Sequence, residues 1–495
     1  MSQSEENRES GFAAQVKGAV LWRSGSQIVG QLIAWGTTFL VIRLLEPADY
    51  GMVAMTAAVL AFLDLFNGWG FASALVRAER IDRRQIGQVF GMLIALNVAL
   101  TAILLLLAPY AAAFFGQPMV ADLLRVQALF FLTTPFIALG NALLIRRMDF
   151  KRQSQVNLGA AVLSAFTALG CALGGLGVWT LVAAPGMLWL ARAVGFAFAA
   201  RLWIRPRFRF AGAGAMARFG GAMTLVQCFW FVQSQSDVVI GGRMLDAHTL
   251  GVYTTALFLT QILAAKFVPP LNEVAFAAYS RMQESRRAAM AGAFAKTARL
   301  IMLVALPFYF GLAVTAEPLV LTVLGDKWAE TIPVIPILAM AMPLMTLQIL
   351  FAPATNALDR PSLAVWTGAF GAAMMPVGFL IGIQWGTIGL ACAWLAGMAV
   401  LLGVTMRLSL PAIGASVRAL GAAVAPGLLA SSAMAASVVL LDSALPPLGE
   451  AARLAALVSF GAAAYAALLL VFARSTVEEV IAIIRPRRTA AAQTL

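Results

Sequence analysis

The chain has 495 residues, of which 61% are hydrophobic and 12% charged, and its mean hydropathy is +0.87. Soluble domains carry about 25% charged residues, so this composition excludes a soluble globular protein. The formal net charge of +13 would favour nucleic-acid binding in a soluble protein, but here the basic residues follow a pattern of membrane topology.

Apolar runs of membrane-spanning length follow one another along most of the chain. Each is about 20 residues long, enough to cross roughly 30 Å of hydrocarbon as a helix. They predict an all-α polytopic membrane protein with about 14 transmembrane helices. We expect two parallel lobes of about six helices each around a central cavity, followed by a C-terminal helix hairpin.

The expected segments follow from the polar breaks. In chain order they are a cytoplasmic N-terminal tail at 1–15, an N-lobe at 16–203, a basic cytoplasmic linker at 204–218, a C-lobe at 219–407, a C-terminal hairpin at 408–473 and a basic cytoplasmic tail at 474–495. Within the lobes, spans are expected at 51–75, 122–145 and 333–357, and Pro135 and Pro353 can kink the last two. The outer connections are expected to be short, the longest near 109–121 and a shorter one at 326–331.

A short motif occurs twice in the chain. Residues 43–51 read RLLEPADYG and residues 243–251 read RMLDAHTLG, an offset of 200 residues. The matched pairs include Arg43 and Arg243, Glu46 and Asp246, and Gly51 and Gly251. A match at a fixed offset indicates internal duplication. An even number of spans lies between the copies, so the two halves are expected to be related by an axis along the membrane normal.

Lys and Arg concentrate in alternate breaks between the spans and in the two tails. The basic breaks lie at 77–84, 146–152, 201–218, 281–299 and 407–418. The positive-inside rule therefore predicts that these breaks and both termini are cytoplasmic. The basic residues are also expected to contact anionic membrane lipid, and no nucleic acid.

Sequence patterns for catalysis and metal binding are absent. Cys171, Cys228 and Cys392 lie in apolar runs without paired spacing, and His248 is the single histidine, so we expect no metal site and no histidine-based catalytic pair. No phosphate-binding loop or H-E-x-x-H motif occurs. The sequence predicts a secondary transporter that is not an enzyme and uses no cofactor, with energy from an ion gradient, the membrane potential or consumption of the product.

Two predicted helices carry a polar face. On the first helix, Arg23, Gln27 and Gln31 recur at i, i+4 and i+8, and on the seventh, Gln227 and Asp237 share one face. These faces indicate either a polar cavity or hydrogen bonds that hold helices together.

Three basic side chains are predicted within the membrane. Arg192 and Lys266 lie about 13 Å or more from the surface, too deep to reach it by snorkelling, whereas Arg23 is near enough for snorkelling to remain an alternative. A cavity lined by these three cations would attract a phosphate or carboxylate. Acidic residues would balance their charge or carry a coupling proton, and the candidates are Asp64, Asp237 and Glu273.

Three motifs together resemble those of bacterial polysaccharide flippases. They are RLLEPADYG after the first helix, FLDLFNGWGFASALVR at the end of the second, and RRMDFKR between the fourth and fifth. Such flippases belong to the multidrug/oligosaccharidyl-lipid/polysaccharide (MOP) exporter superfamily. The resemblance covers nearly the whole chain, and its matching positions are Arg43, Leu45, Pro47, Tyr50, Gly51 and Asp64.

This resemblance implies a function. It implies that undecaprenyl-diphosphate-linked oligosaccharide crosses from the inner to the outer leaflet of the bacterial inner membrane, for lipopolysaccharide or exopolysaccharide biosynthesis, by alternating access of the two lobes. A cationic cavity would then meet the diphosphate.

Other functions remain open from the residues alone. An ion-coupled multidrug antiporter of the same superfamily would favour an acidic cavity, against the three cations predicted here. A non-catalytic component of a polysaccharide polymerase or export complex is a further alternative, in which the C-terminal hairpin would meet the partner. A polymerase or ligase would need a large outer loop to hold an active site, and none is predicted.

Overall fold

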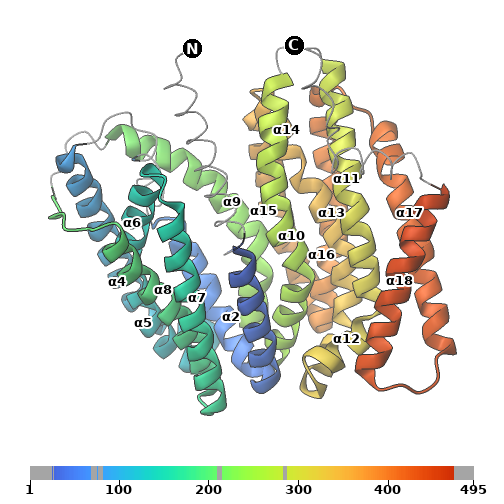
Figure 1. Ribbon diagram of the computed structural model, residues 1–495, viewed down its shortest axis with the longest axis horizontal. Coiled ribbons are helices and arrows are strands. Elements are labelled where there is room, and N and C mark those ends of the chain that lie inside the picture. Colours follow the sequence, from blue (N-terminus) through green and yellow to red (C-terminus); the bar gives the residue numbers. More distant parts are fainter. Residues whose placement is uncertain are drawn as a thin grey trace, which may run out of the picture. The chain divides into compact units, whose positions relative to one another are not determined.

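The computed structural model describes residues 27–67, 82–208, 214–282 and 287–472, together with Gly25 and Leu75. All regular structure in these residues is helical (Figure 1). Eleven described stretches are long and apolar enough to cross a membrane, and the longest of them, Pro361–Ile413, contains two helices of spanning length. The chain is therefore an all-α polytopic membrane protein, as its composition predicts.

The first half of the chain forms one series of helices. In order they are the span Gln27–Leu44, α2 (Pro47–Asp64), α4 (Arg83–Phe115), α5 (Met119–Phe131), α6 (Thr134–Arg146), α7 (Phe150–Leu173), the 3₁₀ turn η1 (Gly177–Trp179) and α8 (Thr180–Ala199). The hairpin of α7 and α8, whose helices pack along each other, ends this series.

The second half repeats this order. Its elements are α9 (Gly214–Met244), α10 (Ala247–Met282), α11 (Arg287–Val314), α12 (Ala316–Val323), η2 (Asp326–Thr331), α13 (Val334–Ile349), α14 (Phe351–Ala357), α15 (Pro361–Gly382), η3 (Ile383–Trp385) and α16 (Gly386–Ile413). Helices α17 (Val417–Ala444) and α18 (Glu450–Phe472) follow as an antiparallel hairpin. The turns η1 and η3 join equivalent hairpins, and each ends in a tryptophan.

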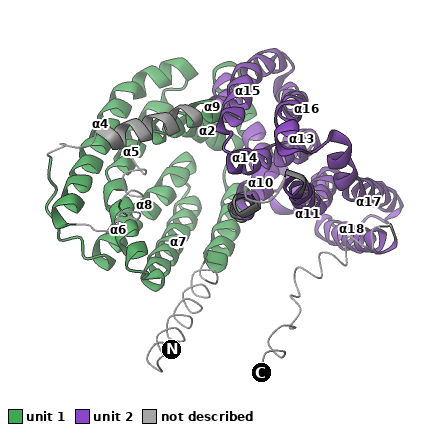
Figure 2. Ribbon diagram, turned by 90° about the horizontal axis from the view of Figure 1, so that it is seen from above, with its two compact units in different colours: residues 1–231, 241–251 green, residues 232–240, 252–495 purple. Residues whose placement is uncertain are grey.

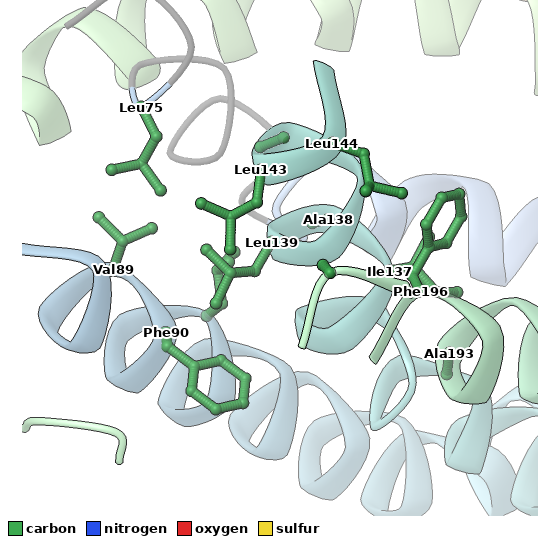
Figure 3. Close-up of a cluster of buried hydrophobic side chains, with 13 residues drawn as sticks. Leu75, Val89, Phe90, Ile137, Ala138, Leu139, Leu143, Leu144, Ala193 and Phe196 are labelled. Carbon is green, nitrogen blue, oxygen red and sulfur yellow. The ribbon is translucent and has the colours of Figure 1, made fainter. Parts of the chain in front are cut away.

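Packing divides the chain into two compact units (Figure 2). Unit 1 comprises residues 1–231 and 241–251, and unit 2 comprises 232–240 and 252–495. A core of buried aliphatic and aromatic side chains from α4, α6 and α8 holds unit 1 together (Figure 3). In unit 2 the C-terminal hairpin packs through α17 on α11, so it is an integral part of that unit. An ion pair also joins the hairpin to α12: Arg453 Nη2 of α18 lies 3.0 Å from Glu317 Oε2.

Two predicted spans consist of two helices each, with the break at a proline named from the sequence. The stretch 122–145 divides into α5 and α6, and 333–357 divides into α13 and α14. Pro135 and Pro353 explain both breaks, because proline has no N–H to donate to the carbonyl four residues earlier. Those carbonyls belong to Phe131 and Ile349, the last residues of α5 and α13.

Other predicted boundaries also need correction. Helix α2 ends at Asp64 and a turn follows at residues 65–67, before the expected end of the span at residue 75. Helix α4 runs through Pro109 to Phe115, where Gly116 ends it with a left-handed φ of 68°. The connection after α4, expected to be the longest on its side, is short, whereas the connection at 315–333 carries α12 and η2 and is the longer.

The duplicated motif forms the same turn in both halves. Residues 41–50 and 241–250 have identical secondary structure, a helix end, a bend and a new helix. Glu46 caps α2 in a capping box, and Asp246 accepts the Thr249 N–H at 2.9 Å at the start of α10. An acidic cap satisfies a free N–H and interacts favourably with the helix dipole. This explains why both copies hold an acidic residue at that position.

The two matched glycines lie against each other within unit 1. A Cβ atom at Gly51 would meet the carbonyl oxygen of Ala247, and one at Gly251 would meet that of Pro47. Only glycine permits two helix backbones to approach this closely. Beside this crossing, Arg243 Nη1 donates to the carbonyl oxygen of Phe114 at 2.7 Å. The outer turn of the second copy is therefore docked on α2 and α4.

Candidate functional site: a polar cavity in unit 1

A cavity of about 620 Å³ lies in unit 1 between the span Gln27–Leu44, α7 and α8. Its polar lining includes Gln27, Gln31, Gln153, Asn157, Ser164 and Arg192. Small residues such as Gly30, Ala34 and Ala161 complete much of the wall and leave room for a ligand. The polar faces of three helices thus meet around one space.

Helix α7 contributes a polar face because of its residue spacing. Gln153, Asn157, Ala161 and Ser164 recur at intervals of three or four residues, which places them on one side of a helix. Ser164 donates to the carbonyl oxygen of Ala184 at 2.8 Å, and Gln153 Nε2 donates to Asn141 Oδ1 at 2.7 Å. The first bond holds α7 against α8, and the second joins α7 to α6 and orients Gln153 at the cavity.

Arg192 supplies the positive charge of the cavity. It lies on α8, is half-buried, and its Nε is buried without a hydrogen-bond partner in the described part of the chain. No acidic residue lines the cavity among the described residues. A guanidinium inside a membrane protein is costly unless it meets a partner or water, and it forms strong bidentate bonds with carboxylate or phosphate. The cavity is therefore suited to an anion.

Asp237 lies in a different setting, in unit 2. It is fully buried on α9, and its Oδ2 accepts from Tyr253 Oη of α10 at 2.7 Å and from Trp394 Nε1 of α16 at 2.8 Å. Its Oδ1 accepts the Val238 N–H at 2.8 Å. Neutral donors from three helices thus surround the carboxylate.

Among the described residues, no other sequence-predicted site residue lines the cavity. Lys266 is exposed on α10 in unit 2, Gln227 is exposed on α9, and Asp64 is exposed at the end of α2, where it accepts from Asn67 Nδ2. Arg23 and the side chain of Glu273 lie outside the described residues. The structure therefore brings Gln27, Gln31 and Arg192 together, and it places Lys266 and Asp237 in the other unit.

Sequence reasoning missed two groups of residues. The spacing of Gln153, Asn157 and Ser164 was the available signal for the α7 face. The partners of Asp237 had no such signal. Trp394 is 157 residues away in the sequence, and only the fold brings it to the carboxylate.

Solved structures share this fold. The "Lipid II flippase MurJ, inward closed conformation" matches with a TM-score of 0.75 at 10% identity, over 92% of this chain and 100% of that one. An inward-facing multidrug resistance MATE family transporter of the MOP superfamily matches with a TM-score of 0.59 at 17% identity, over 79% of this chain and 98% of that one. At these identities the likeness establishes only that this chain shares the fold of these two proteins.

Relatives in sequence point to one family. The succinoglycan biosynthesis transport protein ExoT of Rhizobium meliloti is 27% identical over 69% of this chain and 70% of its own length. The lipopolysaccharide biosynthesis protein WzxC of Escherichia coli is 22% identical over 60% of each chain. The teichuronic acid biosynthesis protein TuaB of Bacillus subtilis is 24% identical over 56% of this chain and 58% of its own. Residues 40–333 match the family described as polysaccharide biosynthesis proteins, and the chain belongs to that family.

Proposed function

We propose that this protein is a flippase that moves undecaprenyl-diphosphate-linked oligosaccharide repeat units across the bacterial inner membrane. The relatives named for succinoglycan transport and lipopolysaccharide biosynthesis support transport of a lipid-linked glycan. The observation that carries the proposal is Arg192, a cation with a buried, unpartnered Nε in a polar cavity of unit 1.

The cavity has the chemistry that such a substrate requires. In a site of low dielectric, the Arg192 guanidinium would hold phosphate oxygens through charge-assisted hydrogen bonds. The side-chain amides of Gln27, Gln31 and Asn157 can both donate to and accept from sugar hydroxyls. A cavity of about 620 Å³ is within the usual range for small-molecule sites and would hold part of the headgroup.

Translocation would proceed by alternating access of the two halves, with both termini cytoplasmic. The docked outer turn would have to release for the outer side to open, because Arg243 packs directly on α4 and Gly251 on α2. Asp237 is our candidate for ion coupling, since protonation or cation binding would change its bonds to Tyr253 and Trp394. Asp64 and Glu273 are further candidates, and Lys266 and Arg23 would add positive charge along the path.

The rival functions fit these observations less well. A cation or drug antiporter would have to place a positive substrate beside Arg192, where no described acidic residue lines the cavity. A purely structural component of an export complex would not need a polar cavity. The hairpin α17–α18 is also packed into unit 2 on α11, so it is less available to a partner.

Substitution of Arg192 tests the proposal. Arg192→Gln is expected to lower export of surface polysaccharide, and binding of the lipid-linked diphosphate by purified protein, by about 10- to 100-fold, because a hydrogen bond to a charged group contributes about 1.5–3 kcal/mol. Arg192→Lys should retain part of the activity, since it keeps the charge without the bidentate geometry.

The matched control is Arg360→Gln, which removes one exposed positive charge in unit 2. It should leave both readouts unchanged at equal protein levels in the membrane. Wild-type export and binding in Arg192→Gln would overturn the role of the cavity. Increased drug sensitivity with normal polysaccharide would favour the antiporter.

A further inference from the structure

The chain that leaves α8 lies as an extended strap on α4. This strap, residues 201–208, is docked through its backbone, because the Arg207 N–H donates to the Gly87 carbonyl oxygen at 2.8 Å. A Cβ atom at Gly87 would be 2.9 Å from the Arg205 carbonyl oxygen, and one at Gly91 would meet the Arg207 carbonyl oxygen. The two glycines lie one helical turn apart, and because they have no side chain the backbone of the strap packs directly on α4.

Side chains of the strap alternate between the protein and its surroundings. Leu202 and Ile204 are half-buried, and Leu202 packs on the unit 1 core shown in Figure 3. Arg201 and Arg205 are exposed, and Trp203 is 85% exposed. This alternation is that of an extended chain with one face on a surface. The outer face of the strap therefore combines basic residues with a large, almost fully exposed indole.

Neighbouring elements hold the strap in place and add charge. Arg201 has a left-handed φ of 53°, which turns the chain at the end of α8, and Arg147 Nη1 donates to the Ala200 carbonyl oxygen at 3.2 Å. Arg83 and Arg84 are exposed on the first turn of α4, one turn before Gly87. The positive charge of the strap thus continues onto the helix end beneath it.

This combination matches the chemistry of a phospholipid headgroup region. Tryptophan is enriched where membrane meets water, because its ring is apolar and its N–H can reach a polar partner. Arginine binds phosphate with several donors, and basic residues at a helix end attract anionic lipid. The strap lies at the end of α8 and the start of α4, where a membrane helix reaches the headgroups, and Phe208 adds a second aromatic ring that is 58% exposed.

We propose that the strap is a binding site for anionic phospholipid of the bilayer leaflet it faces. Arg205 and Arg207 hold the headgroup phosphate, and the Trp203 ring inserts beside the upper acyl chains. The site is distinct from the cavity of Arg192, whose lining includes no residue of the strap. The proposal therefore does not depend on the identity of the transported substrate.

Brominated lipids test the proposal with the full chain in vesicles. The protein is reconstituted in 3:1 phosphatidylcholine and phosphatidylglycerol, with bromine on the acyl chains of one lipid or the other. The difference in quenching between the wild type and Trp203→Phe isolates the signal of Trp203. We expect Trp203 to be quenched more strongly by brominated phosphatidylglycerol than its share of the lipid predicts, and this preference should fall at high salt.

The double variant R205Q/R207Q should lose the preference. Each arginine near an anionic surface contributes about fivefold in affinity, so the relative affinity for phosphatidylglycerol should fall roughly 30-fold. The matched control is R360Q/R418Q, which removes the same number of charges from exposed positions of unit 2. It should retain the preference. Glutamine leaves the backbone contacts to Gly87 and Gly91 intact, so the strap should stay docked.

Three results would overturn the proposal. In the first, Trp203 shows no preference for the anionic lipid in the wild type. In the second, the control loses the preference as fully as the strap variant does, which would indicate a general effect of net charge. In the third, R205Q/R207Q keeps the preference for phosphatidylglycerol and instead weakens binding of a prenyl diphosphate, which would assign the strap to the transported lipid.

Discussion

The hairpins α7–α8 and α15–α16 share one backbone arrangement but differ in polarity. Each turns through a 3₁₀ segment that ends in tryptophan, Trp179 or Trp385. Thirteen positions after that tryptophan stands Arg192 in the first hairpin and Met398 in the second. Arg192 lines a polar cavity, whereas Met398 is fully buried in the core of unit 2.

The remaining surfaces of the two hairpins also differ in polarity. Helix α7 presents amides and hydroxyls to its cavity, while α15 and α16 form an open apolar groove of about 850 Å³ lined by residues such as Met374 and Ile388. The buried carboxylate of unit 2, Asp237, is held by neutral donors from its own unit. Duplication has kept the backbone and changed the surfaces, which is where function is carried on a shared fold.

Exchanging the two matched residues should have the largest effect. Met398→Arg places an unpaired charge in a packed core and is expected to destabilise the protein by about 3–5 kcal/mol or to prevent its folding. The reverse change, Arg192→Met, should alter stability by less than about 1 kcal/mol, because a cavity accommodates the new side chain. Thermal unfolding in detergent measures both. Equal losses in the two variants would show that the hairpins do not differ as described.

Removal of the Asp237 carboxylate should have the second largest effect on stability. Asp237→Ala leaves the Tyr253 hydroxyl and the Trp394 N–H without their acceptor, at a cost of about 1–3 kcal/mol for each buried group. Asp237→Asn keeps an acceptor oxygen and should lose less than half as much. A stable Asp237→Asn variant without transport would support ion coupling at this residue, and one with normal transport would leave it a purely structural role.

A substitution where Gly51 and Gly251 pack together should cause a smaller loss of stability. Gly251→Ala brings a methyl group against the carbonyl oxygen of Pro47, and overpacking of this kind costs about 1–3 kcal/mol. Gly170→Ala on α7 is the matched control, because nothing lies within 4 Å of its Cβ position, and it should be neutral or slightly stabilising. The difference between the two variants in unfolding temperature measures how closely the turn at residues 243–251 packs on α2. Similar shifts would contradict the close approach.

The smallest effect concerns the cap of α10. The Thr249 N–H donates to Asp246 and holds the pKa of that carboxyl below its usual value, which stabilises the folded state above the unfolded pKa of about 3.9. This contribution is lost as the pH falls through the lower, folded pKa. Asp246→Ala should therefore cost about 1 kcal/mol at pH 7 and progressively less below about pH 4. A pH-independent difference in unfolding temperature would contradict this origin.

Much of the architecture followed from the sequence by itself. The apolar runs determined that the chain is an all-helical membrane protein, since only a helix satisfies its own backbone in lipid. The repeated RLLEPADYG and RMLDAHTLG segments marked two equivalent turns, and the structure shows them as identical helix–bend–helix connections. The spacing of Gln27 and Gln31 identified a polar face on the first helix, and the structure places both at the cavity.

The tertiary structure decided what those patterns could not. Pro109 is expected in an outer connection and Pro135 inside a span, yet α4 runs through Pro109 and α5 ends before Pro135. Neither the pairing of Asp237 with Trp394 nor the docking of the strap on Gly87 follows from local spacing. Local sequence determines which helices form and which faces are polar, because those depend on neighbours within a few residues. Which polar face meets which depends on packing between distant segments, and so only the folded chain separates a cavity around Arg192 from a closed core around Met398.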